Sequence, residues 1–169
     1  MPSAPAREHL ASWLAEQRID EPIRWTSADQ WHITLGFFGD DDDPDRREKW
    51  LRRRIGTRPA PTMRLAGGGT WPHVLWAGVD TEGDADAHHF ARLAHAAGAG
   101  RQEDRLRFRP HVTVARWRTG SPDQERLIAL FAGYTGPWFA PTEVLLISSA
   151  PTSGAHTYTT VASLPLVHA

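Results

Sequence analysis

The sequence lacks cysteine entirely, and this absence excludes disulfides, thiolate nucleophiles, iron–sulfur clusters and most structural zinc sites. It also lacks any run of about 18 apolar residues, so we expect no membrane-spanning helix and no membrane partner. Residues 1–19 are polar and contain no continuous apolar core of the kind that a signal peptide needs. Together these absences predict a cytoplasmic protein.

Lysine is nearly absent, because Lys49 is the only one and arginine supplies the rest of the 19 positive charges, against 20 acidic residues. The net charge of −1 does not by itself point to a nucleic-acid partner. Arginine nevertheless suits a bound phosphate, since its planar guanidinium can contact two oxygens at once. Most of the 8 tryptophans are expected in the core or lining a groove.

The length of 169 residues, with 40% hydrophobic and 23% charged residues, suits one globular domain. No linker rich in proline, glycine or serine divides the chain, so we expect a single domain over residues 1–169 and a monomer. Hydrophobic periodicity interleaves helices with strands whose neighbours run antiparallel, which is the α+β class. Helices are expected at 5–17, 44–55, 84–97 and 122–131. Residues 25–38 are expected to form a turn followed by a strand, and further strands are expected at 63–65, 74–79, 108–117, 144–148 and 157–164.

Local signals mark some of the boundaries. Asp43 before Pro44 is a good N-cap and first-turn pair for the second helix. The segment 121–124, Ser-Pro-Asp-Gln, matches a capping box for the last helix. The triple glycine at 67–69 is expected to form a loop, and it is no phosphate loop because no Gly-Lys-Ser/Thr opens a helix after it.

Two segments share a pattern that can carry chemistry, namely Trp-His-Ile-Thr-Leu-Gly-Phe at 31–37 and Pro-His-Val-Thr-Val-Ala-Arg at 110–116. Side chains of a strand alternate between its faces, so His32 shares a face with Thr34 and Gly36. In the second segment His111 shares a face with Thr113 and Ala115. Each strand thus presents an imidazole, a hydroxyl and then a small residue, and the doubling suggests two related lobes whose histidine strands line one cleft.

Such a pair of histidines suits phosphoester chemistry. Histidine has an unperturbed pKa of about 6.5, so it serves as acid or base near neutrality. Two histidines on opposite sides of a phosphorus can deprotonate a water and protonate a departing ribose oxygen, while threonine hydroxyls donate to the non-bridging oxygens. This scheme needs no metal or other cofactor. The alternative is a pair of buried histidines that are hydrogen-bonded inside sheets.

The two motifs, His-Ile-Thr-Leu-Gly-Phe-Phe-Gly at 32–39 and Phe-Arg-Pro-His-Val-Thr-Val-Ala-Arg at 108–116, resemble the paired HxTx signatures of the two-histidine (2H) phosphoesterases. The most similar branch is the RNA 2′,3′-cyclic phosphodiesterases, long called 2′-5′ RNA ligases. Residues 74–79 also resemble a strand of that branch. The resemblance covers nearly the whole chain from about Pro5.

The resemblance implies a bilobal fold, with two antiparallel sheets flanking a central cleft and helices outside. It further implies hydrolysis of terminal 2′,3′-cyclic phosphates of RNA or oligonucleotides to 2′-phosphates, with reversible 2′-5′ RNA ligation as a possible further activity. Carried over, His32 is the proton donor and His111 the proton acceptor, while Thr34 and Thr113 hold the phosphate.

Two features depart from the family pattern or from simple strand geometry. Arg116 matches a family arginine, but its odd offset from His111 puts it on the other face unless the strand is bulged, and an ion pair is the alternative role. Family members usually begin with an apolar strand before the first helix, whereas Met1 to Pro5 runs straight into that helix. We therefore expect an open sheet edge or a gap.

Other functional classes rest on weaker patterns. A metal-dependent phosphoesterase would draw on His88, His89 and His95 with the nearby Asp84 and Asp86, but no spacing matches a known ligand pair. A non-catalytic RNA-binding module would use the basic face of the second helix to contact phosphates. The alternative is that this face is an ordinary solvated one. Its residues are Arg46, Arg47, Lys49, Arg52, Arg53 and Arg54. A serine hydrolase is disfavoured because no Gly-x-Ser-x-Gly elbow occurs, and His73, His156 and His168 are expected on the surface or in loops.

Overall fold

The computed structural model describes residues 1–17, 19–39, 42–98, 108–118, 120, 122–152 and 155–167, with the side chains of all of these except 151, 152, 155 and 156. Within these residues, no helix combines the length and the apolar character that crossing a membrane requires.

Four α-helices lie close to where the sequence predicts them: α1 (Ala4–Glu16), α2 (Pro44–Ile55), α3 (Asp84–Ala97) and α4 (Gln124–Ala132). Helix α2 begins as predicted, because the Asp43 carboxylate accepts the backbone N–H groups of Asp45 and Arg46. Helix α3 ends at Gly98, whose left-handed backbone (φ 104°) suits glycine.

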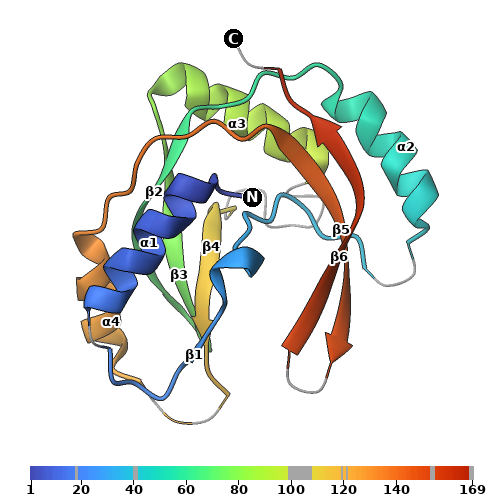
Figure 1. Cartoon of the computed structure of the whole chain (residues 1–169). Helices are drawn as coiled ribbons and strands as arrows, with labels where there is room; N and C mark the ends of the chain where they lie inside the picture. Colours follow the sequence, from blue (N-terminus) through green and yellow to red (C-terminus); the bar gives the residue numbers. More distant parts are fainter. Residues whose placement is uncertain are drawn as a thin grey trace.

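Among the described residues, six strands form two antiparallel sheets, which lie apart in Figure 1. The first sheet has the order β1-β4-β3-β2, and the second consists of the hairpin β5-β6. The strands are β1 (Arg24–Trp25), β2 (Met63–Trp71), β3 (Val74–Thr81), β4 (His111–Arg116), β5 (Glu143–Thr152) and β6 (Ala155–Pro165). The predicted α+β class with two antiparallel sheets is therefore confirmed.

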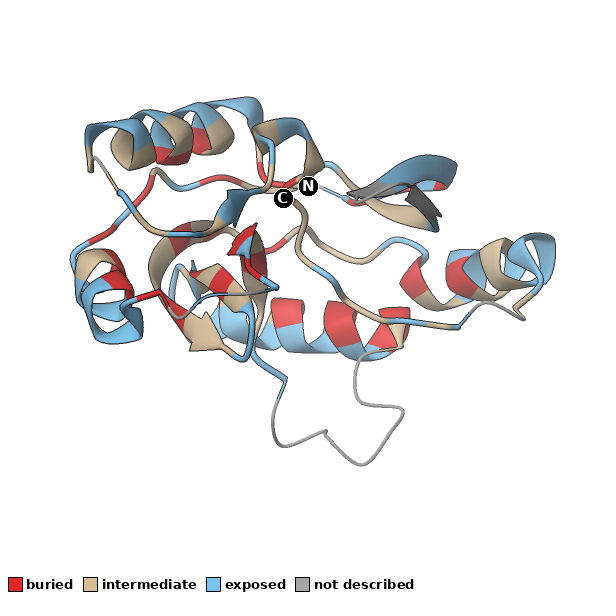
Figure 2. Cartoon of the chain, turned by 90° about the horizontal axis from the view of Figure 1, so that it is seen from below, coloured by how far each residue is buried: buried red, intermediate tan, exposed pale blue. Residues whose placement is uncertain are grey.

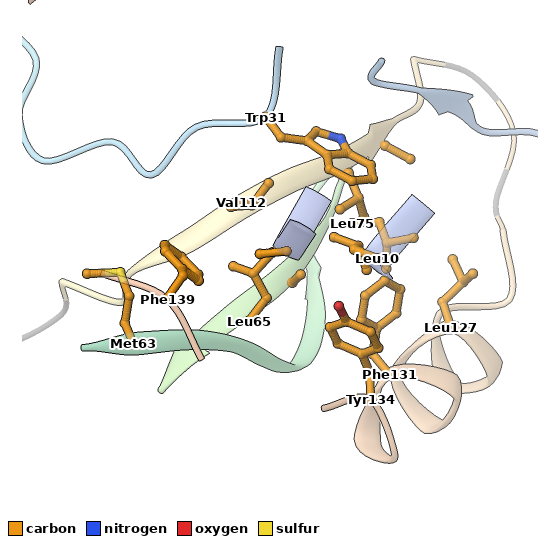
Figure 3. Close-up of a cluster of buried hydrophobic side chains, with 14 of the residues drawn as sticks. Leu10, Trp31, Met63, Leu65, Leu75, Val112, Leu127, Phe131, Tyr134 and Phe139 are labelled. Carbon is orange, nitrogen blue, oxygen red and sulfur yellow. The ribbon is translucent and has the colours of Figure 1, made fainter. Parts of the chain in front are cut away.

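Two hydrophobic clusters hold these sheets against the helices. The first joins one face of the four-stranded sheet to α1 and α4, through residues such as Leu10, Leu75, Val112 and Phe131 (Figure 3). The second joins α2 and α3 to the β5-β6 hairpin, with Leu51, Leu93 and Leu164 among its members. The helices present their buried positions toward these clusters and expose the opposite sides (Figure 2). Each sheet thus has its own core, which matches the expected two lobes.

The first motif does not form the strand that was predicted to follow a turn within 25–38. Between Arg24 and Phe38, the residues that pair with β4 are Arg24 and Trp25, which form β1, and Ile33, which makes an isolated bridge to Val112. The chain then leaves the sheet, because Leu35 and Phe38 pack on the second cluster. Gly36 is needed for this crossing, since a Cβ there would lie 2.7 Å from the backbone oxygen of Ala97 at the end of α3. The small size of Gly36 thus serves the packing of the two lobes.

The glycines at 67–69 are not a loop, because β2 runs through them to Trp71. The register with β3 shifts between Leu65 and Gly68, so the strand contains an irregularity there. Gly69 is buried beneath the indole of Trp76, and a Cβ at this position would lie 2.7 Å from Cζ2 of that ring. The glycines therefore let a strand pass beneath large side chains.

Helix α4 begins later than predicted. Asp123 is its N-cap, and its carboxylate accepts the backbone N–H of Arg126, while its own N–H donates to Glu21. The capping box expected from Ser121 is wrong, because the extended backbone of Asp123 places Pro122 before the helix. Ser121 itself lies outside the described residues.

Candidate active site

The Ile33–Val112 bridge brings the two histidine motifs together. The bridge is antiparallel, and Ile33 follows His32 just as Val112 follows His111. It therefore sets His32 beside Thr113 and Thr34 beside His111. Val112 is fully buried and Ile33 packs on the same cluster, so the alternating neighbours of both residues lie on the opposite face. The two imidazoles and two hydroxyls of the predicted site therefore share one region.

Buried neighbours fix the backbone around each histidine. Trp31 is only 3% exposed, and its Nε1 donates to the backbone oxygen of Thr26 at 3.0 Å. His32 thus follows an anchored residue, as His111 precedes the buried Val112. Both histidines are half-buried, so their rings are accessible while their backbones are held rigidly.

The two histidines make the same hydrogen bond. Nδ1 of His32 lies 2.8 Å from the backbone oxygen of Gln30, and Nδ1 of His111 lies 2.9 Å from that of Arg109. A carbonyl oxygen only accepts, so each Nδ1 carries the proton. This choice of tautomer makes Nε2 of each neutral ring a proton acceptor, and Nε2 of each protonated ring a donor. The site thus holds two imidazoles that are ready for proton transfer.

Strand β4 is bulged between Thr113 and Arg116. Thr113 pairs with Trp76 and Arg116 pairs with Val74, so three steps along β4 match two steps along β3. The extra residue turns Ala115 into the core and returns Arg116 to the face of His111 and Thr113. The alternation expected from the sequence, with Ala115 on the histidine face, is therefore wrong. The bulge instead brings the charge of Arg116 near the ring of His111.

Aromatic rings that sequence reasoning did not assign to the site surround the histidines. Trp71 meets the His111 ring at 85°, with 4.5 Å between the ring centroids, and Trp76 lies 6.4 Å from it. On the other side, Tyr158 of β6 meets the His32 ring at 5.1 Å and 68°. Alternation along β3 could have placed Trp76, but only the hairpin geometry brings Trp71 to His111.

The environment of His111 favours its neutral form. Burial lowers the pKa of His111 below its ordinary value of 6.5, and the charges of His32 and Arg116 lower it further. The hydrogen bond to Arg109 opposes this shift. A histidine that is neutral near pH 7 can accept a proton, which suits the predicted role of His111 as the base.

The basic face of α2 divides into two groups. Arg47 stacks on Phe38 and pairs with Asp42, while Arg54 donates to the backbone oxygens of Ala96 and His95. These two arginines therefore hold the second lobe together. Arg46, Lys49 and Arg53 are exposed, and Arg52 forms an ion pair with Glu48 at 2.7 Å.

The histidines of α3 do not gather into a ligand set. His88 and His95 are exposed, and Asp86 accepts the backbone N–H of Thr62. In the described part of the chain, no three histidine, aspartate or glutamate side chains come close enough to hold a metal ion. His73 is an exposed residue of the β2-β3 turn, whereas the side chain of His156 and the whole of His168 lie outside the described parts.

The model of the 2′-5′ RNA ligase superfamily matches residues 3–150 of the chain, which include both motifs. The chain belongs to this superfamily. The two-histidine resemblance read from the sequence is therefore confirmed.

Two curated proteins similar to this chain are named RNA 2′,3′-cyclic phosphodiesterase. The protein from Geobacillus stearothermophilus is 27% identical over 99% of this chain, and the chain spans only 55% of its length. The protein from Escherichia coli (strain K12) is 28% identical over 92% of this chain and 87% of its own.

Solved structures also share the fold. E. coli LigT complexed with 3′-AMP has a TM-score of 0.67 and 26% identity, covering 97% of this chain and 92% of LigT. TT0787 of Thermus thermophilus has a TM-score of 0.67 at 20% identity, covering 94% of this chain and 90% of its own.

Proposed function

We propose that this protein hydrolyses 2′,3′-cyclic phosphates at the ends of RNA or oligonucleotides to 2′-phosphates, using His32 and His111 as a metal-free acid–base pair. The observation that carries this proposal is the matched hydrogen bonding of the two rings, since both Nδ1 atoms donate to a backbone oxygen two residues earlier. Two imidazoles with the same tautomer, beside two threonines, are what a phosphoryl transfer with one donor and one acceptor requires. The names of the superfamily relatives support the same substrate class.

The reaction begins when Nε2 of neutral His111 takes a proton from a water molecule. The water oxygen forms a bond to phosphorus on the side opposite O3′, and the P–O3′ bond breaks. Nε2–H of protonated His32 gives its proton to O3′, which leaves as a hydroxyl. The product carries a 2′-phosphate, and the two histidines return to their starting states by exchanging protons with solvent.

The remaining site residues stabilise the phosphate as its charge grows. The hydroxyls of Thr34 and Thr113 donate to the non-bridging oxygens, and the guanidinium of Arg116 adds a charged donor on the same face. Ligation is the same displacement with a 5′-hydroxyl in place of water, and it gives a 2′-5′ linkage. A cytoplasmic location and a monomeric state stay predictions from the sequence.

The decisive experiment incubates the purified protein with a nucleoside 2′,3′-cyclic phosphate in EDTA and resolves the products by phosphorus NMR. We expect the 2′-phosphate, and we expect His32→Gln and His111→Gln each to lower kcat by about 100- to 10,000-fold. Each imidazole donates a hydrogen bond to a backbone oxygen, whose loss costs about 1 kcal/mol, and glutamine fills much of the same space, so both variants should fold. A 3′-phosphate product, or loss of activity in EDTA, would contradict the mechanism.

A further inference from the structure

Two tryptophans in tilted ring contact lie beside His111 on the face of the sheet that carries the site. Trp76 lies over the buried Gly69, where a Cβ would come within 2.7 Å of its indole. Trp71 lies next to Trp76, with 5.0 Å between ring centroids and 32° between the planes. Trp71 is the last residue of β2 and is half-buried, so part of its indole contacts solvent. Trp71 therefore contacts two rings, that of Trp76 at a tilt and that of His111 nearly at a right angle.

We propose that Trp71 is a stacking platform for the base of the terminal nucleotide, an inference that rests on the cyclic phosphodiesterase function proposed above. The base is attached to C1′ of the ribose, and C2′, the next carbon, carries an oxygen of the cyclic phosphate. When His111 holds water against that phosphorus, the base therefore cannot lie far from the imidazole. Trp71 lies against that imidazole and keeps part of its indole exposed, and the face of an indole tolerates any base.

The fixed orientation of Trp71 favours stacking over mere steric support. Its contact with Trp76 sets the plane of the ring before a ligand arrives, so little conformational entropy is lost when a base binds. The glycine at position 69 contributes to this by leaving room for Trp76. Stacking strength grows with ring area, so purine substrates should be preferred over pyrimidine substrates.

The test compares two substrates that share the cyclic phosphate but differ in the base. These are adenosine 2′,3′-cyclic phosphate and methyl riboside 2,3-cyclic phosphate, which carries a methoxy group in place of the base. Removing one stacking ring typically weakens binding of one base by about 5- to 150-fold. We expect Trp71→Ala to lower kcat/KM for adenosine 2′,3′-cyclic phosphate by such a factor, mainly through KM. For the base-free substrate KM should stay unchanged, and any loss should fall on kcat because Trp71 also contacts His111. Trp71→Phe should keep most of the preference for adenosine.

Trp138→Ala is the matched control, because Trp138 is also partly exposed and stacks on Arg64 instead. Equal losses on both substrates in Trp71→Ala would overturn the platform and leave Trp71 as a support for His111. Calorimetry with adenosine 2′-phosphate and methyl riboside 2-phosphate measures binding without turnover. It therefore tests the stacking platform separately from the proposed phosphodiesterase activity. Suppose that the protein shows no turnover but binds adenosine 2′-phosphate more tightly, and that Trp71→Ala abolishes this preference. That result would refute the phosphodiesterase function and leave the stacking platform standing. Equal affinities in the wild type would refute the platform.

Discussion

Replacing Gly69 with alanine tests whether the glycine strand really supports the active site. The new Cβ would stand 2.7 Å from Cζ2, 3.2 Å from Cε2 and 3.3 Å from Cη2 of Trp76. Carbon atoms attract best at about 3.5–4.0 Å, so the indole must move by about 1 Å. Trp71 lies against this indole and also against His111, so we expect the displacement to reach the ring of the proposed base.

The expected cost has a structural and a catalytic part. Overpacking of this kind typically destabilises a protein by about 1–3 kcal/mol. For a chain of this size, such a loss lowers Tm by roughly 2–12 °C. A shift of about 1 Å in a catalytic group can lower the rate by about 100-fold. We therefore expect Gly69→Ala to melt earlier and to hydrolyse cyclic phosphates far more slowly at temperatures where it is folded.

Gly133→Ala provides the control for a glycine substitution as such. No atom lies within 4 Å of a Cβ at Gly133, and its φ of −93° is one that alanine readily adopts. This variant should match or slightly exceed the wild type in Tm, with unchanged kcat/KM. Melting curves and initial rates on the same samples check both expectations. A Gly69→Ala protein with wild-type Tm and rate would refute the reasoning that Trp76 and Trp71 transmit packing to His111.

The remaining predictions concern pH, RNA binding and stability. The plot of kcat/KM against pH should be bell-shaped, and its acid limb should have a midpoint below 6.5, because His111 must be neutral and its pKa is lowered; a flat profile between about pH 5 and 8 would contradict the pairing. His32→Gln should raise the pKa of His111, followed by NMR, because it removes a nearby positive charge, and an unchanged pKa would place the rings too far apart. Replacing the exposed Arg46, Lys49 and Arg53 with glutamine should weaken binding of longer RNA more than of a mononucleotide and reduce its salt dependence, whereas equal losses would show that α2 does not touch RNA. Asp123→Ala should lower the free energy of unfolding in urea by about 0.5–2 kcal/mol, since it removes the cap of α4, and an unchanged midpoint would refute that role.

The sequence was informative wherever a signal is local. The Asp43 cap and Gly98 are read from neighbouring residues, and both mark helix boundaries in the structure. The same holds for the doubled His-x-Thr pattern, which points to paired acid–base chemistry before any fold is known. The α+β class and family membership also follow from periodicity and motifs spread along the chain.

Errors arose where long-range packing competes with local preference. A run of glycines normally breaks a strand, yet β2 continues through it because Trp76 and Phe131 need the space that side chains would fill. The aromatic segment after His32 favours a strand, but Phe38 packs on the second cluster and Leu35 packs against both clusters, so the chain crosses between the lobes instead. The N-cap of α4 is Asp123 and not the expected Ser121. The backbone N–H of Asp123 also donates a hydrogen bond to Glu21, which is far away in the chain.

The residue types of the site were therefore determined by the sequence, while their arrangement was decided by tertiary structure. His32, Thr34, His111 and Thr113 could be named from their motifs, because the chemistry of a side chain is local. Their meeting depends on one bridge, Ile33–Val112, between segments far apart in the chain. The placement of Arg116 depends on a bulge in β4 that only its pairing with β3 reveals. Register and bulges arise from contacts between strands, and for that reason no reading of one strand alone could supply them.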